Sequence, residues 1–318
     1  MPNALDESLL SRFRNDTERL IDRPAEVERF GIAVSGGPDS MALLALAHAT
    51  YPGQVEAATV NHGFRTEAAE EAAMVAQWCG GKGIPHATLH PPEPIVGSLQ
   101  SAARKMRYRL LWHWCGERGL GWLITAHHAD DQLETMLMRL NRGSGVAGLA
   151  GVRARTDRLL RPLLFWRRSE LAEVAARAGC PTVQDPSNFD PHFDRAAIRA
   201  RLKQTDWLDS LSASRSAAAL ADAENALEWA IEGLVAQFID HYGQEIRLSR
   251  IDFPREIQRR LLLRMISRLE PRLKPRGDAL DQALVQLALG KKYTMGGLLL
   301  QGGEIWTVKP AAPRRRTC

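Results

Sequence analysis

The chain has 318 residues, of which 45% are hydrophobic and 25% charged, and its formal net charge is +5. This composition is ordinary for a globular protein of about two domains, and no apolar stretch approaches the ~18 residues of a membrane span, so we exclude a membrane-spanning class. The four cysteines (Cys79, Cys115, Cys180 and Cys318) form no C-x-x-C pair, which argues against a zinc ribbon, a redox pair or a disulfide framework.

The N-terminal segment mixes charged residues into a helical pattern, and it lacks the apolar core of a signal peptide. We therefore expect a cytoplasmic protein. The first half of the chain then alternates short apolar strands with helices. Strands are predicted at 32–34, 55–60, 84–90 and 121–128, and helices at 41–49, 67–79, 99–116 and 130–142. This alternation predicts an α/β domain, with an open parallel sheet covered by helices on both faces.

In the third quarter this alternation ends. A glycine-rich loop at 143–152 and a helix at 169–178 precede a long irregular stretch at 181–194, and loops of that length are uncommon unless they serve a function. Beyond residue 210 the pattern predicts helices at 210–240 and 254–269, followed by two strands around Gly302 and Gly303. We expect a first domain at 1–209 and a smaller α+β domain at 210–318.

A six-residue turn separates the first strand from the first helix. Its backbone N–H groups and two hydroxyls would face one concavity at a helix N-terminus, where phosphate can bind. Ordinary strand-to-helix turns use the same residue types, so both interpretations stay open on loop chemistry alone. The lysine of a P-loop and the G-x-G-x-x-G pattern of dinucleotide sites are both absent. The turn consists of Ser35, Gly36, Gly37, Pro38, Asp39 and Ser40.

Polar residues also follow the strand at 121–128, whose carboxyl end should lie at the same sheet edge as this turn. Asp130 is predicted to cap the next helix, and Asp131 and Glu134 share one face of it. These two carboxylates suit a cationic amine or Mg²⁺, or they only offset the helix dipole. His127 and His128 lack a third ligand at zinc spacing, which favours hydrogen bonding or packing over a metal site.

Basic residues recur along the chain. Residues 153–168 contain six arginines against one aspartate, and further basic runs occupy 194–203, 271–276 and 314–316. Repeated basic patches suit a phosphate-rich polymer better than a small acidic substrate.

The segment "SGGPDS" (35–40) is similar to the S-G-G-x-D-S loop of the N-type ATP pyrophosphatases, the PP-loop superfamily. Within it the chain resembles the tRNA(Ile)-lysidine synthetase family over residues 28–205, and weakly over 293–308. The run "AHHADDQLET" (126–135) with "DPSN" (185–188) is more specific than the loop. The other matching segments, in the same order, are 60–65, 98–108, 141–151, 161–164 and 184–199.

This resemblance implies an adenine nucleotide alpha hydrolase-like fold and a two-step reaction. ATP adenylates the C2 oxygen of the wobble cytidine in an isoleucine tRNA with a CAU anticodon, and the lysine ε-amine then displaces AMP to form lysidine. The resemblance further implies that Ser35, Gly36, Gly37, Pro38 and Ser40 bind ATP, and that Asp39 faces Mg²⁺ or the amine. It leaves the oligomeric state open, a homodimer included.

The remaining roles follow from the same resemblance. Asp131 and Glu134 would bind the lysine amine, and His127 would hydrogen-bond near the reacting phosphate. Two pairs of arginines complete the expected site: Arg104 and Arg107 would neutralise phosphate charge, and Arg195 and Arg199 would close over the adenylate or guide the tRNA. The chain departs from the family pattern at Asn61, Gln100 and Ala196, and none of these lies in the loop or the acidic pair.

Three other functions fit parts of the pattern. A PP-loop tRNA thiolase would also adenylate a base, but it would deliver sulfur with cysteine pairs or an iron–sulfur cluster, and the missing C-x-x-C disfavours it. A non-catalytic tRNA-binding protein would not need the intact loop and carboxylates. An amidating ligase for small molecules would not need the basic segments.

Overall fold

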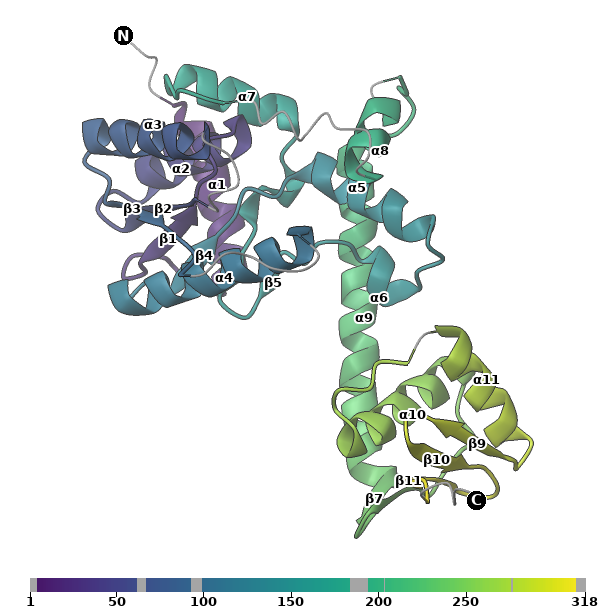
Figure 1. Ribbon diagram of the computed structural model, residues 1–318. Helices are drawn as coiled ribbons and strands as arrows, with labels where there is room; N and C mark the ends of the chain where they lie inside the picture. The colour runs from purple at the N-terminus through teal and green to yellow at the C-terminus, as the bar shows by residue number, and fades with distance from the viewer. Residues whose placement is uncertain are drawn as a thin grey trace. The chain divides into compact units, whose positions relative to one another are not determined.

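The computed structural model describes residues 5–61, 67–92, 99–183, 194–202, 204–275 and 277–312. The chain forms two compact units, one up to Ala221 and one from Asp222 on, and the division falls inside the long helix α9 (Ser210–Phe238; Figure 1). The domain limits expected from the sequence, 1–209 and 210–318, assign the whole of α9 to the second domain.

The first unit contains a six-stranded sheet in the order β3-β2-β1-β4-β6-β5. Its strands are parallel except for the antiparallel pair β5 and β6, which confirms the predicted open α/β sheet. The sequence did not reveal β5 and β6, because each has only two residues and no periodicity to detect. The strands are β1 (Phe30–Ala33), β2 (Val55–Val60), β3 (His86–Leu89), β4 (Trp122–Ile124), β5 (Arg155–Thr156) and β6 (Leu159–Leu160).

Helices cover both faces of this sheet. Ile32 belongs to one apolar cluster with α1, α2, α3 and α7, while its neighbour Ala33 belongs to another with Leu111, Trp114 and Cys115 of α4. This alternation is the two-residue period of a strand buried on both faces. The helices are α1 (Glu7–Ile21), α2 (Pro38–Thr50), α3 (Glu67–Lys82), α4 (Leu99–Arg118), α5 (Ala129–Leu140), α6 (Val146–Leu149), η1 (Pro162–Phe165), α7 (Arg168–Arg177) and α8 (Asp194–Leu202).

A glycine in β1 sets how closely α4 approaches the sheet. A Cβ atom at Gly31 would lie 2.7 Å from a ring carbon of Trp114, which is too close for any other residue. Helix α2, which follows β1, is buried at nearly every position, in keeping with its apolar sequence. The strand and the helix that flank the candidate phosphate-binding loop at 35–40 are therefore both anchored in the core.

The second unit is an antiparallel sheet in the order β7-β8-β11-β10-β9, packed against α10 (Arg255–Leu269) and α11 (Gly277–Ala288). This confirms the predicted smaller α+β region. The two strands predicted around Gly302 and Gly303 are confirmed as the antiparallel pair β10 and β11, but the prediction missed β9, which precedes them because Gly296 and Gly297, both at positive φ, turn the chain once more. The strands are β7 (Ile239–Tyr242), β8 (Glu245–Leu248), β9 (Lys292–Met295), β10 (Leu298–Gln301) and β11 (Trp306–Pro310).

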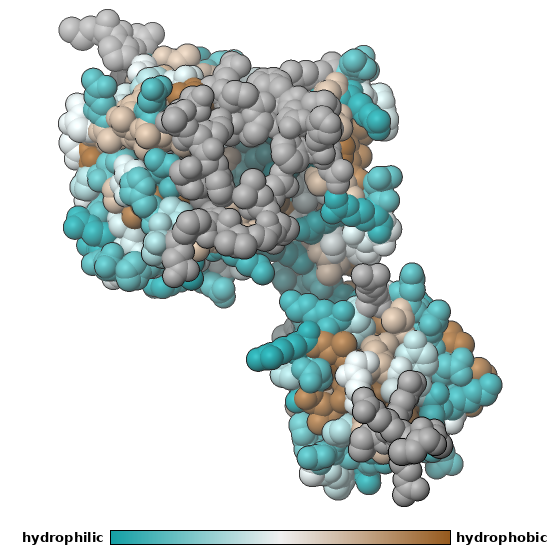
Figure 2. Space-filling model, in the orientation of Figure 1, coloured by the Kyte–Doolittle hydropathy of each residue, from teal (hydrophilic) through white to brown (hydrophobic). Residues whose placement is uncertain are grey.

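Hydrophilic side chains cover much of the face of the molecule shown in Figure 2, in keeping with the charged composition. Within the described ranges, none of the helices has the length and apolar character that crossing a membrane requires.

Candidate active site

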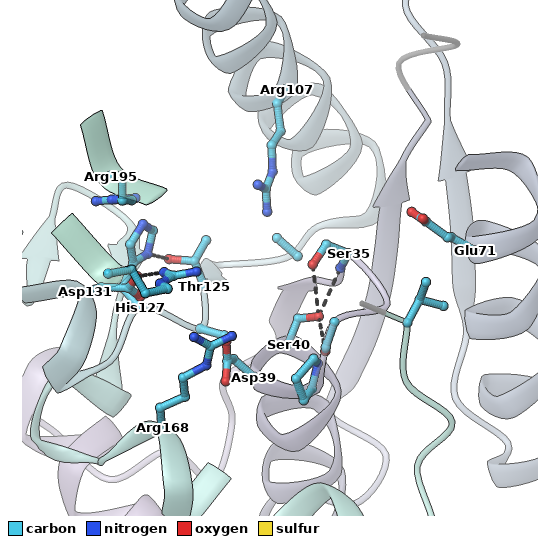
Figure 3. Close-up of a pocket in the computed structure, with 16 residues that line it drawn as sticks. Ser35, Asp39, Ser40, Glu71, Arg107, Thr125, His127, Asp131, Arg168 and Arg195 are labelled. Carbon is cyan, nitrogen blue, oxygen red and sulfur yellow. Dashed lines mark hydrogen bonds and ion pairs between the residues drawn. The ribbon is translucent and has the colours of Figure 1, made fainter. Parts of the chain in front are cut away.

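A pocket of about 430 Å³ opens beyond the carboxyl ends of β1 and β4 (Figure 3). The sequence predicted a site at this edge of the sheet, because a loop with polar side chains follows each of the two strands. The pocket is lined by Ala33, Ser35, Gly37, Pro38, Asp39, Ser40, Glu71, Arg107, Thr125, Ala126, His127, Asp131, Arg168, Val183, Arg195 and Arg199.

The loop between β1 and α2 is organised by Ser40. Its hydroxyl donates to the carbonyl of Gly37 (2.9 Å), accepts from the backbone N–H of Ser35 (3.1 Å) and lies 3.2 Å from Ser35 Oγ. Gly36 has a φ of +81°, a left-handed conformation that favours glycine. Gly36 is not among the residues that line the pocket, and its positive φ lets the loop turn.

Three aspartates surround His128, whose side chain is only 2% exposed. Its Nε2 lies 3.4 Å from Asp39 Oδ2 and 3.6 Å from Asp131 Oδ2, and its Nδ1 lies 3.6 Å from Asp130 Oδ2. Burial by itself would lower the pKa of His128, but the three carboxylates outweigh it and raise the pKa to about 10. A buried imidazolium thus compensates part of the negative charge at this end of the pocket.

Asp130 does not cap its own helix, so that prediction was wrong. Helix α5 starts one residue earlier, and the side chain of Asp131 accepts the backbone N–H of His128 at 3.2 Å. Asp130 Oδ2 instead accepts the backbone N–H of Arg168 at 2.9 Å, at the start of α7. The carboxylate caps a helix that lies far from it in the sequence, which local patterns cannot reveal.

His127 lines the pocket as a neutral side chain. Its Nδ1 lies 2.9 Å from Thr125 Oγ1. Burial lowers the pKa of His127 to about 3; the charge of Asp131 opposes this shift, and the charges of Arg161, Arg104 and Arg107 add to it. At neutral pH this imidazole can donate or accept a hydrogen bond with a ligand and adds no charge to the pocket.

The structure brings Asp131, Glu134, Arg195 and Arg199 together, but it gives the two carboxylates different surroundings. Glu134 is nearly buried and accepts from Arg199 Nε at 2.7 Å and Arg199 Nη2 at 3.0 Å, while Arg195 Nε lies 3.5 Å away. Asp131 lines the pocket and lies 4.0 Å from Arg199 Nη2. Burial by itself would raise the pKa of Asp131, but the charges of His128 and Arg195 lower it, so this carboxylate is ionised at neutral pH.

The structure separates the arginines expected on α4. Arg107 lines the pocket, and burial lowers the pKa of its guanidinium. Arg104 is exposed, with its guanidinium 5.2 Å from the centre of the Tyr108 ring, and it is not part of the pocket wall. The i, i+3 spacing predicted that both side chains lie on one face of α4, but only Arg107 lines the pocket.

Six residues of the pocket wall were not predicted from the sequence as site residues: Ala33, Glu71, Thr125, Ala126, Arg168 and Val183. Arg168 ends the basic run at 153–168, which was the one available signal. Ala196 lies on α8, and the backbone N–H of Asn61 donates to the carbonyl of Leu89 at 2.9 Å. The segments 62–66 and 184–193, and the side chain of Gln100, lie outside the described residues.

Asp39 has the chemistry of a magnesium ligand. Its Oδ1 is buried and has no hydrogen-bond partner among the residues that the structure describes. In the same ranges, no group of three or more His, Cys, Asp or Glu residues is arranged to hold a metal. Mg²⁺ in nucleotide sites is commonly held by one or two carboxylates, phosphates and waters, so the donor set suits Mg²⁺ that arrives with a nucleotide.

Comparison with known proteins is consistent with this geometry. The PP-loop domain family matches residues 9–205. The tRNA(Ile)-lysidine synthase of Zymomonas mobilis subsp. mobilis is 44% identical over 298 residues, which cover 91% of this chain and 90% of that protein. The tRNA(Ile)-lysidine synthase of Novosphingobium aromaticivorans is 44% identical over 260 residues, which cover 80% of this chain and 77% of that protein.

A solved structure shares the fold at low identity. The U34-tRNA thiolase NcsA from Methanococcus maripaludis, with its 4Fe-4S cluster, aligns with a TM-score of 0.54 and 17% identity, over 68% of this chain and 80% of that chain. This similarity supports the fold alone. The family match over more than half of the chain, together with relatives that are similar over most of their length, identifies the chain as a member of the tRNA(Ile)-lysidine synthase family of PP-loop proteins.

Proposed function

We propose that this protein ligates L-lysine to C2 of the wobble cytidine of an isoleucine tRNA with a CAU anticodon, consuming ATP and releasing AMP and pyrophosphate. One observation supports this most strongly: the loop at 35–40 and the polar residues at 125–131 line a single pocket at the carboxyl edge of the sheet. A phosphate-binding loop, an ionised carboxylate and several arginines in one cavity suit a reaction between a nucleotide and an amine.

In the first step the C2 oxygen of cytidine attacks the α-phosphorus of ATP, and pyrophosphate leaves. The loop N–H groups and the Ser35 hydroxyl would hold the β- and γ-phosphates. Arg107 would offset negative charge across the pocket, and neutral His127 would hydrogen-bond near the reacting phosphate. Mg²⁺, held by Asp39, would reduce the charge of the triphosphate.

In the second step the lysine ε-amine attacks C2, the bond from C2 to the adenylate oxygen breaks, and AMP leaves. Adenylation makes this displacement feasible, because it turns a poor leaving group into a good one. Ionised Asp131, on the pocket wall, would attract the lysine ammonium and take up one of its protons before the neutral amine attacks C2.

Glu134 is the second carboxylate expected to bind the amine. Because Arg199 already occupies it with two hydrogen bonds, we propose that binding of the ammonium displaces this guanidinium. Arg199 and Arg195, both on the pocket wall, would then turn towards the adenylate or the tRNA. In the resting site Glu134 serves to hold α8 against α5.

We further propose that residues 210–318 contact the tRNA, that the protein acts in the cytoplasm and that a homodimer is a candidate assembly. The recurrent basic segments support a nucleic-acid partner.

The decisive experiment mixes the purified protein with isoleucine tRNA bearing a CAU anticodon, Mg-ATP and labelled lysine. Label in the tRNA together with AMP release is the expected result. AMP release without label would retain the adenylation step and point to another second substrate, with thiolation tested next. If folded protein gives neither label in the tRNA nor AMP release, the proposal is contradicted and a binding module remains.

A further inference from the structure

Four arginines line the pocket, and two of them already have partners. Arg199 makes two hydrogen bonds to Glu134, while Arg195 donates to Thr135 Oγ1 at 3.0 Å and lies 3.5 Å from Glu134. For Arg107 and Arg168, no carboxylate of the described chain lies within ion-pairing distance. A pocket with two unneutralised guanidinium groups is prepared for an anionic ligand.

Arg168 lies on the side of the pocket formed by the phosphate loop. Figure 3 shows its guanidinium beside Asp39, the fifth residue of the loop, whereas Arg107 reaches the pocket from α4 on another side. In a nucleotide bound by this loop, the groups nearest to Asp39 are the phosphates that the loop itself holds. The position of Arg168 therefore suits the β- and γ-phosphates.

The backbone of Arg168 is held in place from both sides. Its N–H donates to Asp130 Oδ2, and Asp130 lies 3.6 Å from His128, which in turn lies 3.4 Å from Asp39. Leu171, the first residue of the next turn of α7 to face inward, is fully buried in the core that also contains α2. A guanidinium on a fixed helix start costs little entropy to bring to a ligand.

From this geometry we infer that Arg168 binds the pyrophosphate portion of ATP, and that Asp130 is a positioning residue for it. The inference rests on the proposed ATP-dependent adenylation and adds a contact from outside the PP-loop motif. It also explains why the carboxylate of Asp130 is directed to α7 instead of its own helix. The guanidinium would hold the β- and γ-phosphates in the ground state and the pyrophosphate as it leaves.

The test compares Arg168→Gln and Arg168→Lys with Arg177→Gln, a control at the exposed end of the same helix. Calorimetry measures the affinity of each variant for inorganic pyrophosphate with Mg²⁺, and kinetics measure the KM values for ATP and lysine. Loss of a charged hydrogen bond should weaken pyrophosphate binding by at least about tenfold in Arg168→Gln. The pyrophosphate affinity of Arg168→Lys should lie between those of wild type and Arg168→Gln, since lysine keeps the charge but lacks the planar guanidinium that can donate two hydrogen bonds at once.

The expected pattern is a raised KM for ATP with an unchanged KM for lysine, and wild-type behaviour in Arg177→Gln. Pyrophosphate affinity that is equal in wild type and a folded Arg168→Gln, or absent from the wild type, overturns the inference. Asp130→Asn, which keeps an oxygen for the N–H, should bind pyrophosphate more tightly than Asp130→Ala. Because the calorimetric result needs no tRNA or lysine, failure of lysidine formation alone would count against the proposed function and not against Arg168.

Discussion

Ser40 holds together the loop between β1 and α2, since its hydroxyl bridges the backbone of Ser35 and Gly37. We predict that Ser40→Ala abolishes ATP-dependent AMP release while the fold remains, at a cost of about 1 kcal/mol for the lost hydrogen bonds. Ser214→Ala is a suitable control, because Ser214 Oγ is buried without a hydrogen-bond partner in the described chain. Circular dichroism and AMP release measured on both variants provide the check, and an active Ser40→Ala would contradict the role of the loop.

Asp131 is an ionised carboxylate on the pocket wall. Asp131→Ala should raise the KM for lysine by at least about tenfold, because a charge-assisted contact with the ammonium is lost, and should change the KM for ATP less. Asp157→Asn is the matched control, since this exposed aspartate lies at a positive φ that asparagine tolerates. Unchanged lysine kinetics in Asp131→Ala would remove Asp131 from amine binding.

Asp16 gives the first unit a pH-dependent stability. Burial raises the pKa of Asp16, and the hydrogen bond from Trp166 Nε1 (3.0 Å) and the nearby arginines offset this only in part. Below its ordinary pKa the carboxyl is neutral in both the folded and the unfolded protein, and it does not affect stability. As pH rises from the ordinary pKa through the raised folded-state pKa, the unfolded chain ionises more readily than the folded protein, so stability falls.

Asp16→Asn, which keeps an acceptor for the indole, should therefore be more stable than wild type at pH 7. The difference should shrink as pH falls through the folded-state pKa towards the ordinary value. Thermal melts of both proteins from neutral to acid pH measure it. A stability difference that does not vary with pH would show that packing, not ionisation, sets the effect.

At the scale of elements, Arg260 joins α10 to α9 inside the second unit. Its side chain is only 7% exposed, and it donates to Glu224 at 2.8 and 2.7 Å, to Glu228 at 2.5 Å and to Glu256 at 2.9 Å. The hydrogen bonds to Glu224, followed by the charges around it, raise the pKa of Arg260. Each partner of such a cluster depends on the others, because a buried carboxylate left alone is costly.

Arg260→Ala should lower the free energy of unfolding by about 3–5 kcal/mol, since it removes the guanidinium that makes two hydrogen bonds to the buried carboxylate of Glu224. Arg264→Ala is the matched control one turn further along α10. Arg264 is more exposed and pairs with Glu228 and Glu232, so its loss should cost no more than about 1 kcal/mol. Urea unfolding of the two variants decides the matter, and equal losses would contradict the role given to burial.

The predicted elements succeeded where apolar periodicity was strong and long. The helices at α2, α3, α4, α5 and α9 and the first four strands were foreseen to within a few residues at their ends. The two-residue strands β5 and β6, and the extra turn at Gly296 and Gly297, escaped because so short a segment carries no period. Asp130 was misjudged for another reason: its partner is the start of α7, and pairing over that separation is decided by packing.

Over the whole molecule, basic segments recur in both units, and a partner rich in phosphate should bind with a strong dependence on salt. Charge reversal at Arg314, Arg315 and Arg316, which lie outside the described residues, should weaken tRNA affinity mainly at low salt and flatten the salt dependence. Filter binding at several salt concentrations tests this. A slope equal to that of wild type would count against contact between this segment and tRNA.

The sequence by itself determined the α/β class, the phosphate loop, the family resemblance and the sheet edge at which the polar loops would meet, because each depends on local periodicity or on contiguous motifs. Only the tertiary structure decided which side chains share the pocket. It placed Arg107 on the wall and Arg104 outside it, engaged Glu134 with Arg199, surrounded His128 with three aspartates and brought Arg168 beside Asp39. These relations join residues far apart in the chain, and their charges and burial arise only when the helices pack on the sheet.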